Sequence, residues 1–245
     1  MKVYIRKNKQ GEFFNSNMYS AYYGFNELGA EIIPYEDIKL LNTNPEDIIV
    51  DGILQTRYIF NKFNCSYPNL EYPQEIAINK FLKRKIWQDT LGNIMANKEK
   101  WNVFIKPVVG GKLFTGTAIK SFKDFRYCVG ADTDTKVWCS ELVDFTSEYR
   151  CFIRYGNILD IKHYHGDPFM VPSKKFIQDI INEYKSAPNA YTIDIGIDKN
   201  GEEYLIEVNE GYSVGSYGLD HIKYAKFLAT RWAQITNTED EYKYF

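Results

Sequence analysis

The chain lacks a long apolar run and a strong charge excess. No apolar stretch approaches the roughly 18 residues that a membrane span requires, so we expect no transmembrane helix. Thirty Lys and Arg residues against 32 Asp and Glu residues give a net charge of −2. That balance leaves no chain-wide basic footprint for nucleic acid, although a local basic patch stays open. The opening MKVYIRKNKQ becomes charged too early for a secretory signal, and we expect a cytoplasmic protein.

Cysteine is scarce and scattered along the chain. Cys65, Cys128, Cys139 and Cys151 show no C-x-x-C spacing, and the three histidines complete no zinc-finger pattern with them. We therefore predict free, mostly buried thiols in a reducing compartment. Internal repeats and low-complexity segments are also lacking. The 245 residues are enough for a sizeable core in one large domain or in two to three lobes.

The first third of the chain has a strand–helix–strand rhythm. Strands are predicted at 2–6 and 47–50, with a helix between them that ends near Gly29. This rhythm is typical of an α/β layer. The segment NCSYPNLEYPQE, at 64–75, carries two prolines and reads as a loop and lobe boundary.

The remaining chain mixes hairpins and helices. Apolar residues at 76, 81, 86 and 91 predict an amphipathic helix that ends at Gly92. A hairpin should follow with its tip at 110–111, then three strands with turns at 144–147 and 156–157. We predict a helix over about 173–185, a second hairpin over 191–211 and a closing helix over about 220–235. This order indicates an α+β fold in three parts: 1–75, 76–138 and 139–245.

Three oxygen-bearing side chains are predicted to meet on the last hairpin. Glu207 and Asn209 lie two residues apart on one strand and so share a face. Asp194 lies 13 residues before Glu207 on the partner strand, where cross-strand Cβ atoms are about 5 Å apart. Two carboxylates and an amide oxygen suit Mg²⁺, which fills its shell with water and phosphates. The alternative is three surface polar groups that flank a hairpin.

A cation and a glycine-rich turn mark the first hairpin. Lys106 ends an apolar strand in FIKPVVGGKLFTGT, where a lysine is costly unless it serves a ligand. Gly110 and Gly111 would let backbone N–H groups approach that ligand closely. Lys112, Thr115 and Gly116 follow within reach. The spacing is not that of a Walker A loop, and a plain glycine hairpin with exposed lysines remains the alternative.

The segment WCSELVDFTSEYRCF lies between these two groups. Glu141 and Val143 stand at a strand end, where free backbone groups could read the rim of an adenine. Glu148 and Arg150 share a face, and Arg150 could clamp a phosphoryl group or a carboxylate. A salt bridge is the alternative for this pair. We interpret His163 and His165 as ordinary strand residues, because no third ligand has suitable spacing.

The order of these motifs resembles the ATP-grasp superfamily over about residues 76–218. FIKP with its glycine-rich hairpin, SELV, EYR and IDIG…LIEVNEG carry the resemblance, and the short chain is similar to a compact bacterial and phage clade. The resemblance implies an ATP-grasp fold, in which two α+β lobes grip ATP behind a short N-terminal α/β lobe. ATP and Mg²⁺ are the implied cofactors.

The resemblance also implies roles for individual residues. Lys106 would hold the α/β-phosphates, the 110–116 loop would cover the β/γ-phosphates, and Arg150 would face the transferred phosphoryl group. Asp194, Glu207 and Asn209 would hold Mg²⁺. The adenine would lie at Glu141, Leu142 and Val143, with Glu148 near the ribose or a phosphate-bound cation. A further phosphate-binding lysine is either Lys80 or Lys85, whose alternative role is on a solvated helix face.

The implied chemistry is amide formation through an acyl phosphate. A carboxylate substrate would attack the γ-phosphate of ATP, and an amine, such as that of an amino acid or peptide, would then displace phosphate. Positioning and charge neutralisation would supply most of the catalysis. Two alternatives stay open: a phosphotransferase or nucleic-acid-modifying enzyme with the same nucleotide site, and a nucleotide-binding module without turnover. Residues 212–217 either shape the acceptor pocket or form a plain loop.

Overall fold

The computed structural model describes residues 1–68, 70, 72, 80–108 and 113–244. The chain divides into two compact units, which are described separately below. The larger unit joins residues 1–81 to residues 145–245, and the smaller unit spans residues 82–144. The three-part division expected from the sequence stays a prediction. Within the described residues, no helix is both long enough and apolar enough to cross a membrane.

The N-terminal part of the larger unit is a parallel α/β layer, as its rhythm predicts. Its strands lie in the order β2-β1-β3, and both outer strands run parallel to β1. Two α-helices and a short 3-10 helix connect or follow them. The elements in chain order are β1 (Lys2–Arg6), α1 (Ser16–Glu27), β2 (Glu31–Tyr35), η1 (Ile38–Leu40), β3 (Ile48–Val50) and α2 (Ile53–Lys62).

Local signals in the sequence fix both ends of α1. The Asn15 side chain accepts hydrogen bonds from the backbone N–H groups of Asn17 and Met18, which the first helical turn leaves without partners. After the helix, Gly29 takes a left-handed backbone with φ of 78°, which glycine adopts at little cost. The helix therefore ends near Gly29, as the sequence predicts.

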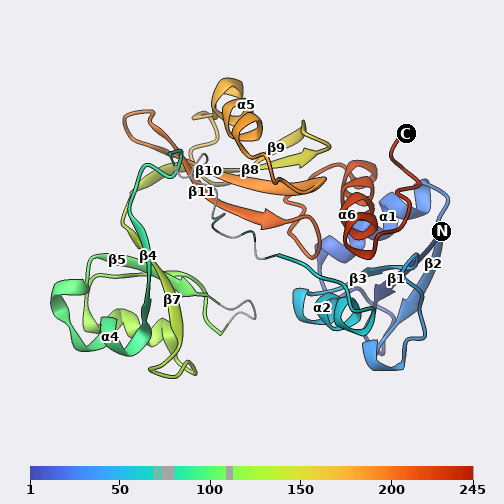
Figure 1. Ribbon diagram of the computed structural model, residues 1–245, viewed down its shortest axis with the longest axis horizontal. Helices are drawn as coiled ribbons and strands as arrows, with labels where there is room; N and C mark the ends of the chain where they lie inside the picture. Colours follow the sequence, from blue (N-terminus) through green and yellow to red (C-terminus); the bar gives the residue numbers. More distant parts are fainter. Residues whose placement is uncertain (69, 71, 73–79, 109–112, 245) are drawn as a thin grey trace. The chain divides into compact units, whose positions relative to one another are not determined.

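The C-terminal part is an antiparallel sheet with helices packed on it (Figure 1). Its strands lie in the order β11-β10-β8-β9. The inner strand β10 is almost wholly buried. On α5, the buried residues are Phe176, Ile177 and Ile180. The elements are β8 (Phe145–Arg154), β9 (Asn157–Gly166), α5 (Lys174–Glu183), β10 (Ala190–Asp198), β11 (Glu203–Glu210) and α6 (His221–Thr236).

One apolar core joins the two parts of the larger unit. The core includes Val3 and Phe60 from the N-terminal layer, and Phe227 and Trp232 from α6. Helices α1 and α6 cross closely at Gly24, where a Cβ atom would lie 1.9 Å from the carbonyl oxygen of His221. Only a residue without a side chain fits that crossing.

The smaller unit is a four-stranded antiparallel sheet in the order β4-β7-β5-β6. The hairpin predicted around Lys106 is confirmed, because β5 pairs with β6. Its tip at Gly110 and Gly111 lies outside the described residues. The elements are β4 (Ile86–Thr90), α4 (Leu91–Ala96), η2 (Lys98–Lys100), β5 (Val103–Pro107), β6 (Thr117–Ile119), η3 (Phe122–Cys128) and β7 (Lys136–Glu141).

Two sequence-based expectations about local structure are wrong. Residues 86–90 form strand β4, paired with β7, rather than the end of a helix, and Gly92 lies inside α4. The apolar spacing of five residues used for that prediction does not follow the 3.6-residue helical period. In addition, β8 begins at Phe145, so residues 145–147 of the expected turn lie in the strand. The connection from β7 ends at Asp144. The four cysteines are free thiols, as predicted.

Candidate functional site

The three oxygen-bearing side chains of the last hairpin lie together. Asp194 on β10 is paired directly with Glu207 on β11. The amide nitrogen of Asn209 donates to Asp194 Oδ2 at 3.2 Å and to Glu207 Oε1 at 3.0 Å. A β-bulge follows Asp194, and bulges commonly redirect side chains next to functional sites. The sequence pattern therefore brings these groups to one point on the sheet.

Arg150 completes this cluster from β8, on the other side of β10. Its Nε and Nη2 donate to the two carboxylate oxygens of Asp194 at 2.8 and 2.6 Å. Both side chains are buried, with Arg150 7% and Asp194 3% exposed. Burial disfavours the guanidinium cation, but the charge and hydrogen bonds of Asp194 outweigh it, and the pKa of Arg150 is raised. Arg150 is therefore a fixed, permanent cation at the carboxylates.

Two tyrosines hold the outer side of Arg150. Its guanidinium carbon lies 4.7 Å from the centre of the Tyr217 ring. That ring stacks on Tyr164, with 5.1 Å between the ring centres. The Tyr164 hydroxyl in turn donates to Glu148 Oε2 at 2.7 Å. Glu148 and Arg150 are therefore linked through two aromatic rings. The salt bridge considered as an alternative is present for Arg150, which pairs across the strands with Asp194.

The loop after β11 is shaped to place Tyr217. Ser213, Tyr217 and Gly218 all have left-handed backbones, with φ of 52°, 45° and 79°. For the two residues with side chains this conformation is uncommon. Gly215 lies close enough that a Cβ atom would be 3.4 Å from the Tyr217 ring. The loop thus keeps strained geometry where it meets Arg150.

The donor set at Asp194 fits a hard divalent cation. Two carboxylates and a carboxamide are the ligand types that Mg²⁺ accepts from proteins. Among the described residues, no three His, Cys, Asp or Glu side chains converge, so a metal site here depends on the amide of Asn209. The side-chain nitrogen of Asn209 points toward both carboxylates. A half-turn of the amide group about its Cβ–Cγ bond would present the oxygen to a metal instead.

Lys106 in the smaller unit is buried, at 8% exposed, and lies on β5 opposite Trp138. Gly116 packs against this strand: a Cβ atom there would lie 2.5 Å from the Phe104 ring and 3.3 Å from Lys106 Cβ. Thr115 is exposed. Gly110, Gly111 and Lys112 lie outside the described residues. The glycine at 116 thus serves close packing beside the lysine.

Glu141, at the end of β7, is held by the start of β4. Its carboxylate accepts a hydrogen bond from the Lys85 backbone N–H at 2.8 Å, and its own N–H donates to the Lys85 carbonyl at 3.1 Å. Leu142 and Val143 are half-buried in the connection that follows. The two lysine candidates differ: Lys80 pairs with Glu183 at 2.8 Å, whereas the Lys85 ammonium lies 5.6 Å from the centre of the Trp87 ring.

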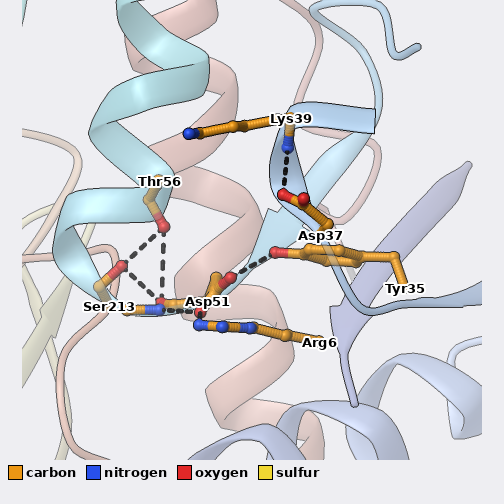
Figure 2. Close-up of polar contacts among 8 residues, drawn as sticks. Arg6, Tyr35, Asp37, Lys39, Asp51, Thr56 and Ser213 are labelled. Carbon is orange, nitrogen blue, oxygen red and sulfur yellow. Dashed lines mark hydrogen bonds and ion pairs between the residues drawn. The ribbon is translucent and has the colours of Figure 1, made fainter. Parts of the chain in front are cut away.

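Sequence reasoning missed Tyr164 and a second polar cluster. Tyr164 lies two residues from Lys162 on one strand and so shares its face, which was a usable signal. The second cluster surrounds Asp51, just after β3 (Figure 2). The Tyr35 hydroxyl donates to Asp51 Oδ2 at 2.6 Å, and Arg6 Nη1 lies 3.5 Å from Oδ1. Ser213 donates to the Asp51 backbone carbonyl at 2.8 Å.

Comparison with solved structures finds the same fold in several ligases. An L-amino acid ligase from Bacillus licheniformis matches with a TM-score of 0.57 and 12% identity, covering 96% of this chain and 75% of its own. The D-alanine–D-alanine ligase from Bacillus anthracis gives 0.53 and 14%, with 97% and 99% covered. The D-cycloserine synthetase DcsG gives 0.59 and 10%, with 95% and 100% covered. At these identities the likeness shows a shared fold.

A search of curated proteins by sequence finds no match. A family model does match: the ATP-grasp domain of R2K clade family 2 aligns with residues 81–227. This range holds Lys106, Arg150 and the hairpin with Asp194 and Glu207, and it covers more than half of the chain. Fold and family model agree, and the chain belongs to the ATP-grasp superfamily, in R2K clade family 2.

Proposed function

We propose that the protein is an ATP-dependent carboxylate–amine ligase that acts through an acyl phosphate. The observation that carries this proposal is the cluster of Asp194, Glu207 and Asn209 beside the buried Arg150. It combines a hard-cation donor set with a fixed guanidinium, which is what a triphosphate needs. Solved relatives of the same fold, by their names, join amino acids. The likeness supports the reaction type and leaves the substrates open.

In the proposed reaction, a substrate carboxylate oxygen attacks the γ-phosphorus of ATP, and the bond from that phosphorus to the β-γ bridging oxygen breaks. ADP leaves and a mixed anhydride forms. An amine then attacks the acyl carbon, loses a proton and expels inorganic phosphate, which leaves an amide. Arg150 would orient the phosphoryl oxygens and balance their charge. Tyr217 and Tyr164 would keep the guanidinium in place while it does so.

Asp194, Glu207 and Asn209 would hold Mg²⁺. When bound, the ion would neutralise negative charge that develops on the phosphate oxygens. In the smaller unit, Lys106 would bind the α/β-phosphates. Gly110, Gly111, Lys112, Thr115 and Gly116 would cover the β/γ-phosphates. Glu141, Leu142 and Val143 would contact adenine, and Glu148 would lie near the ribose.

Glu207→Gln tests the metal assignment. The substitution keeps the shape and removes one ligand charge, so Mg²⁺-dependent ADP release should fall at least ~100-fold with thermal unfolding little changed. The matched control is Glu202→Gln, in the exposed turn of the same hairpin, which should turn over normally. Unchanged turnover in Glu207→Gln would remove this residue from the metal site.

The reaction class needs a second measurement. ADP release should be assayed with pooled amino acids, with and without hydroxylamine as the acyl trap. Hydroxamate formation is expected from an acyl phosphate. ADP release without any hydroxamate would point to a phosphotransferase and contradict the ligase. ATP binding with neither product would point to a module without turnover.

A further inference from the structure

Polar groups gather at the carboxyl ends of the three parallel strands of the N-terminal layer. Arg6 ends β1, Tyr35 ends β2, and Asp51 follows β3. Strand β1 lies between the other two, so the chain leaves it first to one side and then to the other. In open α/β sheets, ligands bind outside the carboxyl ends of the strands at such a switch point.

Asp51 is fully engaged by the protein. Its side chain is 1% exposed. Its two oxygens accept from the Tyr35 hydroxyl, from the Gly52 backbone N–H at 2.6 Å and, more weakly, from Arg6. Burial and this hydrogen bond both raise the pKa of Tyr35, so the phenol stays a donor. Asp51 therefore serves to position its neighbours and does not itself face a ligand.

Arg6 is the outward-facing member of the cluster. Its side chain is 28% exposed, and its guanidinium carbon lies 4.2 Å from the centre of the Phe14 ring. Within the described residues, the one hydrogen bond of the Arg6 guanidinium is the 3.5 Å contact with Asp51. A guanidinium has five N–H donors. Arg6 is thus held from two sides and keeps donors for a planar oxyanion, which a carboxylate matches in geometry.

A pocket opens beside Asp51, the residue that Arg6 contacts, and Arg6 itself is not among its lining residues. Its polar members include Asn15, Asn17, Asp51 and Ser213, and its apolar members include Met18 and Val214. The cavity measures about 70 Å³, which is room for a small side chain and little more. Asn15 and Asn17 use their side-chain oxygens as acceptors within the protein. Within the described residues, the side-chain NH₂ groups of Asn15 and Asn17 donate no hydrogen bond and remain available to a ligand.

One short loop links this pocket to Arg150. Ser213 contacts the Asp51 carbonyl, and Tyr217, four residues later, contacts Arg150. Four residues span at most about 14 Å when fully extended. One short segment of chain therefore contacts both the Asp51 cluster and Arg150.

We propose that Arg6 binds the non-reacting carboxylate of the ligase's amine substrate, an amino acid or short peptide. The pocket takes its side chain, and its amine points toward Arg150. The identity of this molecule as a substrate rests on the proposed function, whereas its binding at Arg6 does not. Asp51 and Phe14 are positioning residues, since they act on the ligand only through Arg6.

Calorimetric binding without ATP tests this proposal. The probes are the twenty common amino acids and their glycyl dipeptides, each as the free acid and as its C-terminal amide. At least one free acid should bind about tenfold or more tightly than its amide. Arg6→Gln should reduce binding of that acid to the level of the amide, and Arg6→Lys should retain part of the preference. Lys39→Gln is the matched control, because Lys39 is an exposed cation in η1, shortly after β2, with no side-chain partner among the described residues.

Three results would overturn the proposal. These are equal binding of acid and amide in every pair, an acid preference that survives in Arg6→Gln, and Arg6-dependent binding of inorganic phosphate without binding of any amino acid. The hydroxylamine trap separates the two proposals. A failed trap with acid preference intact would remove the ligase reaction and leave the Arg6 site in place.

Discussion

Two buried aspartates of the larger unit, Asp194 and Asp51, hold their arginines in opposite ways. Asp194 binds Arg150 through both carboxylate oxygens at 2.8 and 2.6 Å, so the arginine is locked. The Asp51 carboxylate accepts its shortest hydrogen bonds from a phenol and a backbone amide, and Arg6 Nη1 remains 3.5 Å away. The difference teaches that a carboxylate can either fix a cation or leave it partly available, depending on what else satisfies its oxygens.

Removing the charge of each aspartate should separate the two arrangements most clearly. Asp194→Asn leaves Arg150 buried without its charged partner, which should lower the free energy of unfolding by about 3–5 kcal/mol. Asp51→Asn should lower it by only about 1–2 kcal/mol, because Arg6 can turn to water. Urea unfolding measures both. The double variant Asp194→Asn/Arg150→Met should recover much of the loss, and equal losses in the two single variants would contradict the comparison.

Tyr35→Phe sharpens the comparison at Asp51. At neutral pH the loss of the phenol donor should cost about 1–3 kcal/mol. The pKa of Tyr35 is raised above its ordinary 10.0, first by burial and then by Asp51. The folded state thus holds this proton more tightly than the unfolded state, so the stabilisation is full below about pH 10 and is lost as the pH rises.

The free energy of unfolding should therefore fall less steeply as the pH rises above about 10 in Tyr35→Phe than in the unmodified protein. Other buried tyrosines contribute to the same slope, so the difference between the two proteins is the quantity to measure. Tyr58→Phe, at an exposed tyrosine, is the matched control and should leave the slope unchanged. Identical slopes for Tyr35→Phe and the unmodified protein would show that this phenol does not carry the effect.

The smallest expected effect concerns the rings that cover the arginines. Tyr217→Leu should destabilise by about 1–2 kcal/mol, because Arg150 is buried, whereas Phe14→Leu should cost about 0.5–1 kcal/mol beside the more exposed Arg6. Tyr217→Phe keeps the ring and should behave like the unmodified protein. Thermal unfolding ranks the three variants. A Tyr217→Phe variant as unstable as Tyr217→Leu would assign the effect to the hydroxyl.

The sequence predicts the Asp194–Glu207 pairing because both residues lie on one short hairpin. The register set by the turn at Gly201 would place Asp194 opposite Ile206, and the β-bulge after Asp194 shifts the pairing to Glu207. Alternation along the strand then gives Asn209. The partner of Arg150 could not be predicted in this way. It depends on β8 lying beside β10, two strands that are not consecutive in the chain.

The Asp51 cluster was out of reach for the same reason. It draws on residues 6, 35, 51 and 213, and no local pattern records that these positions meet. The segment at 86–90 failed differently: its apolar residues are compatible with strand or helix, and pairing with β7 decides the outcome. The start of α6 was predicted to within a residue because its chemistry is local: the Asp220 side chain caps the helix by accepting from the Lys223 N–H.

The close crossing at Gly24 has a consequence for modularity. Because α1 meets the His221 backbone with no room for even a methyl group, the surface of the N-terminal layer and that of the closing helix are matched to each other. Exchanging residues 1–68 with those of a relative would leave a mismatched seam along α6, and a working chimaera would have to carry the closing helix with them.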